Sequence, residues 1–155
     1  MEDAGDRRVL VGVDRSASSI EALRCGARIA AALGAPLEAV TVWTFPPDTS
    51  PYPIGTWKPR EGAIVALDQA IEAAFGASPP AIRRIVLSGH VSRTLVAESD
   101  RSGMLVLGSR GQGGFAGMLL GSVSATCAEH AHCPVLIVHA PARARRGSAV
   151  IRAAR

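Results

Sequence analysis

The stretch Leu105-Val-Leu-Gly-Ser-Arg-Gly-Gln-Gly-Gly-Phe-Ala-Gly-Met-Leu-Leu-Gly-Ser-Val-Ser124 joins an apolar, strand-like run to a loop rich in glycine, and a helix-like segment, 125–131, follows it. Glycine loses more chain entropy on folding than any other residue, so glycine at this density indicates a loop shaped for a purpose. Backbone N–H groups approach an anion closely where no Cβ intervenes, and a helix start adds N–H groups and a positive dipole end. The stretch therefore predicts a phosphate cradle; the alternative is a flexible connection.

Length and composition indicate one globular domain. The chain has 155 residues, of which 48% are hydrophobic and 19% charged, which is typical of a protein with a sizeable core. No apolar run reaches the roughly 18 residues of a membrane span, and no signal peptide is visible. We therefore predict a domain over residues 1–140, a cytoplasmic location and no membrane partner.

The positive charge is concentrated at the end of the chain. The formal net charge is +4, and the C-terminal stretch contains Arg143, Arg145, Arg146, Arg152 and Arg155. We predict that residues 141–155 form a disordered, solvated tail, and we do not expect nucleic acid as a partner. The cysteines show no metal-ligand spacing, and their odd number argues against a full disulfide framework; free thiols are expected at Cys25, Cys127 and Cys133.

Strand-like and helix-like segments alternate along the chain. Apolar runs predict strands over 8–14, 37–43, 82–88, 104–108 and 133–139, and helical spacing of apolar residues predicts helices over 20–33, 61–75, 92–102 and 125–131. This alternation predicts an α/β domain with one doubly wound, mostly parallel five-stranded sheet and helices on both faces. Loops 14–19 and 109–121 both leave strand carboxyl ends, so they face each other across one crevice if those two strands are neighbours.

Three segments together resemble the universal stress protein family, in its ATP-binding branch. Gly108-x2-Gly111-x9-Gly121-Ser122 fits that branch's pattern G-x2-G-x9-G-[ST] at every defined position. Val11-Gly-Val-Asp14 is similar to the family's opening strand, and the segment 130–138 is similar to its closing strand. The resemblance covers residues 9–139 and implies a Rossmann-like fold of the adenine nucleotide alpha-hydrolase type.

The resemblance also implies a binding site for ATP or another adenine nucleotide. It places the base near Val13, Val42 and Leu107, with Asp14 on the ribose or phosphate side. It implies that the ribose and phosphates are bordered by Gly108 and Gly111, and that the phosphates are received by Gly121, Ser122, Val123 and Ser124. Mg²⁺ between Asp14 and the phosphates would reconcile the carboxylate with an anionic ligand. Family members commonly dimerise through the last strand, which here implies Val135, Leu136, Ile137 and Val138.

Several of these residues also have purely structural interpretations. Ser122 and Ser124 are favoured types for helix caps, Asp14 suits a turn, and Arg110 suits a solvated loop. His130 and His132 flank a helix end but have no evident third metal ligand. These alternatives stay open on the sequence alone.

The same residues favour binding over catalysis. The chain has no P-loop of the form G-x4-G-K-[ST], and its one lysine, Lys58, lies outside the cradle. Phosphoryl transfer needs charge stabilisation and a positioned nucleophile, whereas the loop offers only Arg110. We therefore expect an ATP-binding module, dimeric and cytoplasmic, that acts in stress response or signalling through nucleotide-dependent conformation. The alternatives are a slow ATPase or nucleotide-dependent enzyme on the same fold, and an interaction protein that binds no nucleotide.

Overall fold

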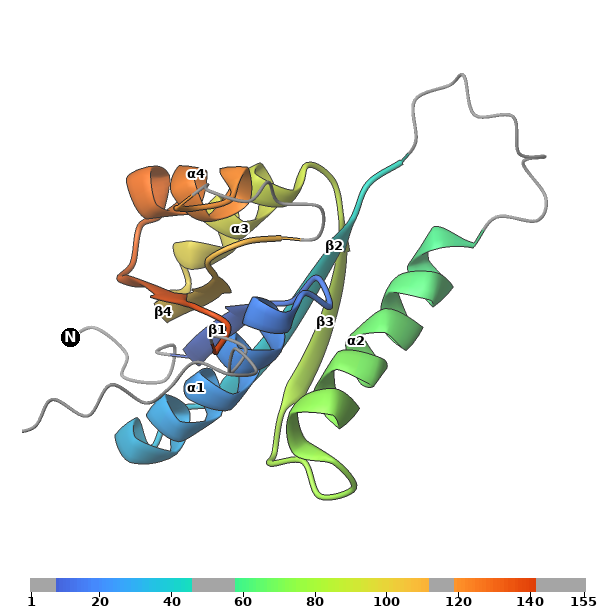
Figure 1. The fold of residues 1–155 in the computed structure, drawn as a ribbon. Coiled ribbons are helices and arrows are strands. Elements are labelled where there is room, and N and C mark those ends of the chain that lie inside the picture. Colours follow the sequence, from blue (N-terminus) through green and yellow to red (C-terminus); the bar gives the residue numbers. More distant parts are fainter. Residues whose placement is uncertain (1–7, 46–57, 112–118, 142–155) are drawn as a thin grey trace, which may run out of the picture.

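The computed structural model describes residues 8–45, 58–111 and 119–141. Strands and helices alternate along them (Figure 1) in the order β1 (Arg8–Gly12), α1 (Ala17–Leu33), β2 (Leu37–Trp43), α2 (Pro59–Phe75), β3 (Arg83–Ser88), α3 (Val91–Ser99), β4 (Ser102–Gly108), α4 (Ser122–His130) and β5 (Val135–Val138). The predicted alternation is confirmed. The predicted tail lies outside the described residues, apart from Pro141.

The strands form one parallel sheet in the order β3-β2-β1-β4-β5. The central strand β1 pairs Val9 with Leu37 of β2 on one side and with Met104 of β4 on the other. The chain thus winds outward in one direction through β2 and β3, and in the other through β4 and β5. This reversal confirms the doubly wound α/β class and makes β1 and β4 the neighbours on which the predicted crevice depends.

Helices cover both faces of the sheet, and each face has its own hydrophobic core. Val9 and Val11 of β1 pack into a cluster with residues of α1 and α2, whereas Leu10 packs into a cluster with residues of α3 and α4. Figure 1 shows α3 and α4 together on one side of the sheet. Because β1 is buried on both faces, its sequence is a continuous apolar run instead of an alternating one.

The helices α1 and α4 begin earlier than their apolar spacing predicted. The hydroxyl oxygen of Ser16 accepts a hydrogen bond of 3.2 Å from the amide of Ser19 and caps α1, which begins at Ala17. Gly121 is extended, with φ −69° and ψ 164°, and precedes the first residue of α4, Ser122. Small and polar residues fill both first turns, so hydrophobic periodicity could not detect them. The interpretation of the serines at 122 and 124 as caps is wrong, because Gly121 holds the cap position.

Several predicted boundaries also shift by one to three residues. The predicted strands 8–14 and 133–139 are shorter, at Arg8–Gly12 and Val135–Val138. The predicted strand 104–108 begins earlier, at Ser102, and the predicted helix 92–102 ends earlier, at Ser99. No helix in the described ranges combines the length and the apolarity needed to span a bilayer.

An ion network ties the amino-terminal ends of the strands to α3. The guanidinium of Arg8 contacts the carboxylates of Glu38 in β2 and, at 2.6 Å, Glu98 in α3. Burial of Glu98 raises its pKa, but the hydrogen bond from Arg8 and the charge of Arg101 outweigh that effect, and the pKa of Glu98 lies below its usual value. The network therefore stabilises the end of the sheet opposite to the predicted crevice.

Candidate functional site

A cavity of about 680 Å³ lies at the carboxyl ends of β1 and β4, between the first turns of α1 and α4. This is the position at which doubly wound sheets bind ligands, and the volume falls within the range of small-molecule sites. The residues predicted for a nucleotide site all line this cavity: Val13, Asp14, Val42, Leu107, Gly108, Gly111, Gly121, Ser122, Val123 and Ser124. The structure thus brings together residues from β1, β2, β4, α4 and the connecting loops.

The lining has an apolar part and a polar part. Most apolar side chains of the lining belong to the hydrophobic cluster beneath α3 and α4: Val40, Val42, Val91, Leu95, Leu107 and Val123. The polar residues come from the turn after β1 and the loop after β4 and include Asp14, Ser16, Ser19, Arg110 and Ser122. A ligand with a planar apolar ring and an anionic end matches this division.

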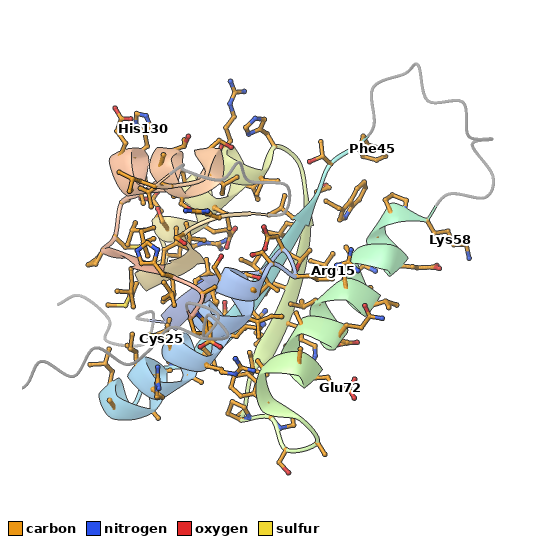
Figure 2. The ribbon with its side chains drawn as sticks, in the orientation of Figure 1. Arg15, Cys25, Phe45, Lys58, Glu72 and His130 are labelled. Carbon is orange, nitrogen blue, oxygen red and sulfur yellow. The ribbon has the colours of Figure 1, made fainter. Side chains whose placement is uncertain are left out.

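Some lining residues were not predicted from the sequence. Ala66 of α2 and the α3 residues Val91 and Leu95 close the cavity from the sides. Helical spacing showed only that Leu95 faces inward, because which helix borders the crevice depends on the strand order. Arg15 is a further unpredicted lining residue, and Figure 2 labels it at the turn between β1 and α1.

Hydrogen bonds shape the turn after β1. One carboxylate oxygen of Asp14, Oδ1, accepts hydrogen bonds from the amide of Ser16, at 2.9 Å, and from its hydroxyl. The hydroxyl of Thr41 in β2 donates to the carbonyl of Val13 at 3.0 Å. The interpretation of Asp14 as a turn residue is therefore confirmed, and its side chain also lines the cavity.

The loop after β4 is held at three successive carbonyls. The hydroxyl of Ser124 in α4 donates to the carbonyl of Gly108 at 2.6 Å. The amide of Gly121 donates to the carbonyl of Ser109 at 2.7 Å. The hydroxyl of Ser18 in α1 donates to the carbonyl of Arg110 at 2.7 Å. Helices on opposite faces of the sheet therefore fix the first residues of this loop.

Little space is left for a side chain where the two loops approach each other, and least of all at Gly108. A Cβ on Gly111 would lie 2.9 Å from Oδ2 of Asp14, and a Cβ on Gly121 would lie 3.3 Å from the amide nitrogen of Gly111. A Cβ on Gly108 would lie 2.4 Å from the Ser18 hydroxyl. These glycines allow the backbone, the Asp14 carboxylate and the helix starts to share one small space.

The start of α4 supplies backbone donors to the cavity. The first hydrogen bond within α4 runs from the amide of Ala125 to the carbonyl of Gly121 at 3.0 Å. The amides of Ser122, Val123 and Ser124 precede it, so they belong to the group of helix-start N–H groups that have no partner inside their own helix. With the positive end of the helix dipole, these amides suit an anion.

The cysteines and histidines contribute no recognisable chemistry to the cavity. Cys25, Cys127 and Cys133 are free, as predicted. Burial, with a smaller contribution from Cys133, raises the pKa of the Cys127 thiol to about 11, so this thiol is a weak nucleophile at neutral pH. Across 8–45, 58–111 and 119–141, no three histidine, cysteine, aspartate or glutamate side chains gather as metal ligands.

Comparison with known proteins gives a consistent result. The model of the universal stress protein family matches residues 6–139. A universal stress protein of Mycobacterium bovis is 36% identical over 139 residues, which covers 84% of this chain and 47% of the relative. This chain thus spans about half the length of that relative.

Solved structures show the same fold. A universal stress protein in complex with cAMP is 29% identical, with a TM-score of 0.65, and the match covers 88% of this chain and 99% of that one. A universal stress protein from Lactobacillus plantarum is 22% identical, with a TM-score of 0.67 and the same shares covered. The two solved structures share the fold of this chain. Because the family model matches residues 6–139, the chain belongs to the universal stress protein family.

Proposed function

We propose that this chain binds an adenine nucleotide, with ATP as the expected ligand, in the cavity at the carboxyl ends of β1 and β4. The observation that carries the proposal is the two-part lining, in which an apolar cluster adjoins a glycine-lined region at the starts of α1 and α4. The similar structure with cAMP supports an adenine nucleotide as the ligand class. The glycines that line the cavity, Gly108, Gly111 and Gly121, fit such a ligand, because backbone without a Cβ can approach an anion closely.

Each part of the nucleotide has proposed contacts. The adenine would lie against Val13, Val42 and Leu107, and the ribose hydroxyls would donate to the carboxylate of Asp14. The phosphates would accept hydrogen bonds from the backbone around Gly108, Gly111 and Gly121 and from the amides of Ser122, Val123 and Ser124. The Ser124 hydroxyl donates to Gly108, so this side chain would act mainly by shaping the loop. As an alternative to the ribose contact, the Asp14 carboxylate would help to hold Mg²⁺, which would offset its repulsion of the phosphates.

The proposed role is to hold nucleotide and respond to it, in stress response or signalling in the cytoplasm. A bound phosphate group would neutralise the helix-start dipoles and fix the loops joined by Ser18 and Arg110. Nucleotide level would then be reported as loop order to a partner surface. The cavity lining includes Asp14 but no histidine, glutamate or lysine in the part of the chain that the structure describes. Binding is therefore favoured over rapid hydrolysis.

We propose in addition that two copies pair through β5. This strand lies at the edge of the sheet, next to β4. The carbonyls of Pro134 and Val138 accept hydrogen bonds from Leu105 and Ser109, so the alternation along a strand directs the backbone groups of Val135 and Ile137 away from β4. An apolar edge strand with outward N–H and C=O groups favours pairing with another strand.

Two measurements test nucleotide binding. Freshly purified protein is denatured and any released nucleotide is identified by chromatography, and affinity for ATP is measured by calorimetry with and without Mg²⁺. Gly121→Val should abolish ATP binding, whereas Gly62→Ala, on α2 with nothing within 4 Å of its added Cβ, should leave it unchanged. Equal ATP affinity in the two variants would contradict the site. Intact ATP after incubation supports holding, and stoichiometric ADP would favour the slow ATPase.

A further inference from the structure

Arg15 has an unusual backbone conformation. Its φ is 67°, and among the residues that the structure describes no other non-glycine residue has a positive φ. This left-handed region is disfavoured for a residue with a Cβ, because the Cβ crowds the following carbonyl, whereas glycine enters it freely. A glycine at position 15 would therefore form the same turn without strain.

The surrounding hydrogen bonds force this conformation. Asp14 accepts from the amide of Ser16 at 2.9 Å, Ser16 accepts from the amide of Ser19 at 3.2 Å, and Val13 donates to β2. The turn is thus fixed on both sides of Arg15. Strained residues persist where their surroundings over-determine them, and such residues concentrate at functional sites.

The side chain of Arg15 is not used to stabilise the described fold. Neither Arg15 nor Arg110 forms an ion pair within 8–45, 58–111 and 119–141. Both residues are exposed, and both line the cavity. The only other ionisable lining residue in the described ranges is Asp14. The side chains therefore give the cavity a net positive charge, to which the starts of α1 and α4 add.

The two arginines come from loops that are tied together. The Ser18 hydroxyl donates to the carbonyl of Arg110 at 2.7 Å, which fixes the backbone of Arg110 against the start of α1. Arg15 lies in the turn that leads into the same helix. Guanidinium groups bind phosphate oxygens in a bidentate manner and keep their charge at every physiological pH.

We propose that Arg15 and Arg110 form a phosphate-binding pair that makes the cavity select nucleotides by the length of their phosphate chain. This inference rests on the proposed nucleotide function and specifies which nucleotides the site prefers. Affinity should increase from AMP to ADP to ATP, because only the longer phosphate chains reach both guanidinium groups. Strain at position 15 is retained because glycine, which would relieve it, supplies no charge.

The test measures affinity for adenosine, AMP, ADP and ATP by calorimetry in the full chain. The variants are Arg15→Gly, Arg15→Ala, Arg15→Lys and Arg110→Gln, with Arg28→Gln on the exposed surface of α1 as a control for net charge. We expect Arg15→Gly and Arg15→Ala to lower ATP affinity about tenfold and adenosine affinity not at all. Arg15→Lys should keep part of the ATP preference, and Arg28→Gln should match the wild type.

Thermal unfolding without ligand tests the strain separately. Both Arg15→Gly and Arg15→Ala remove the charge, but only glycine removes the strain, so Arg15→Gly should have a Tm about 2–4 °C above that of Arg15→Ala. Equal Tm values would overturn the strain argument. Equal affinities for AMP and ATP in the wild type, or an unchanged preference in the arginine variants, would overturn the phosphate pair alone. Failure of the wild type to bind any of the four ligands would overturn the proposed function itself.

Discussion

The hydroxyl of Ser18, in the first turn of α1, donates a hydrogen bond of 2.7 Å to the backbone carbonyl of Arg110, in the loop after β4. The two residues are far apart in the sequence, and their contact joins both loops of the cavity. Gly108 makes the approach possible, because a Cβ there would lie 2.4 Å from the Ser18 hydroxyl. The position of Arg110, at the start of the loop after β4, thus depends on α1 as well as on its own sequence.

Ser18→Ala should loosen the start of the loop after β4, at Arg110. The change leaves the Arg110 carbonyl without its donor, and we expect a loss of about 1–3 kcal/mol in the free energy of unfolding. ATP affinity should fall about fivefold, since binding must then order the loop. The control is Ser99→Ala, which removes a buried hydroxyl that donates to Val96 and accepts from His132. It should lower stability similarly and leave affinity unchanged; equal affinity losses would contradict the role of Ser18.

Gly111→Ala should act through Asp14. The added Cβ would lie 2.9 Å from Oδ2 of Asp14, so the carboxylate must move from its place in the turn. We expect about a tenfold loss of ATP affinity by calorimetry. In the background of Asp14→Ala, the same glycine substitution should have little further effect, since contacting residues are not additive. Additive losses would show that Gly111 acts independently of Asp14.

Protonation of Glu98 should lower the stability of the folded protein at acidic pH. Its pKa in the folded protein lies below the usual value, chiefly because Arg8 outweighs the effect of burial. Its contribution is therefore complete above the pKa of the unfolded chain and is lost as pH falls through the folded pKa. Glu98→Gln should be less stable than the wild type at pH 6, and the difference in Tm should narrow towards pH 3. A difference that is constant with pH would contradict the proton linkage.

Arg8→Met should lower the free energy of unfolding more than a substitution of Glu38 or Glu98 does. Among the described residues, removing the guanidinium leaves Glu38 with the exposed Arg83, at 3.3 Å, and Glu98 with the exposed Arg101, at 2.9 Å. We expect a loss of about 1–3 kcal/mol in the free energy of unfolding, measured in urea, because both carboxylates lose their most buried hydrogen-bonding partner. Nucleotide affinity should stay unchanged in the folded protein, because the network lies at the end of the sheet opposite to the cavity.

Ile137→Pro should test the proposed dimer. Proline removes an N–H group that we expect to face away from β4 and to pair with a second copy. Size-exclusion chromatography with light scattering should then show a monomer. Ile137→Ala loses the same side chain but keeps the N–H group, so it should stay dimeric. A dimer in both variants would contradict pairing through β5.

The sequence predicted the helices and strands because these features depend on local chemistry, whereas the phosphate cradle stays a prediction. The strand 37–43 has the observed bounds, since an apolar run ends at identifiable neighbours on both sides. The helix starts at Ala17 and Ser122 were missed, because hydrogen bonds and backbone angles set them and not apolar spacing.

What the sequence by itself determined is the alternation of strands and helices, the glycine spacing from Gly108 to Gly121 and the resulting family. Only the tertiary structure decided that β1 lies beside β4, and that Asp14 therefore lies against Gly111. It also decided that Ala66 of α2 and Leu95 of α3 contribute to the cavity wall, and that Arg15 is held at a positive φ. The physical reason is that periodicity reports how one segment is buried, whereas the partners of each loop depend on long-range pairing of strands.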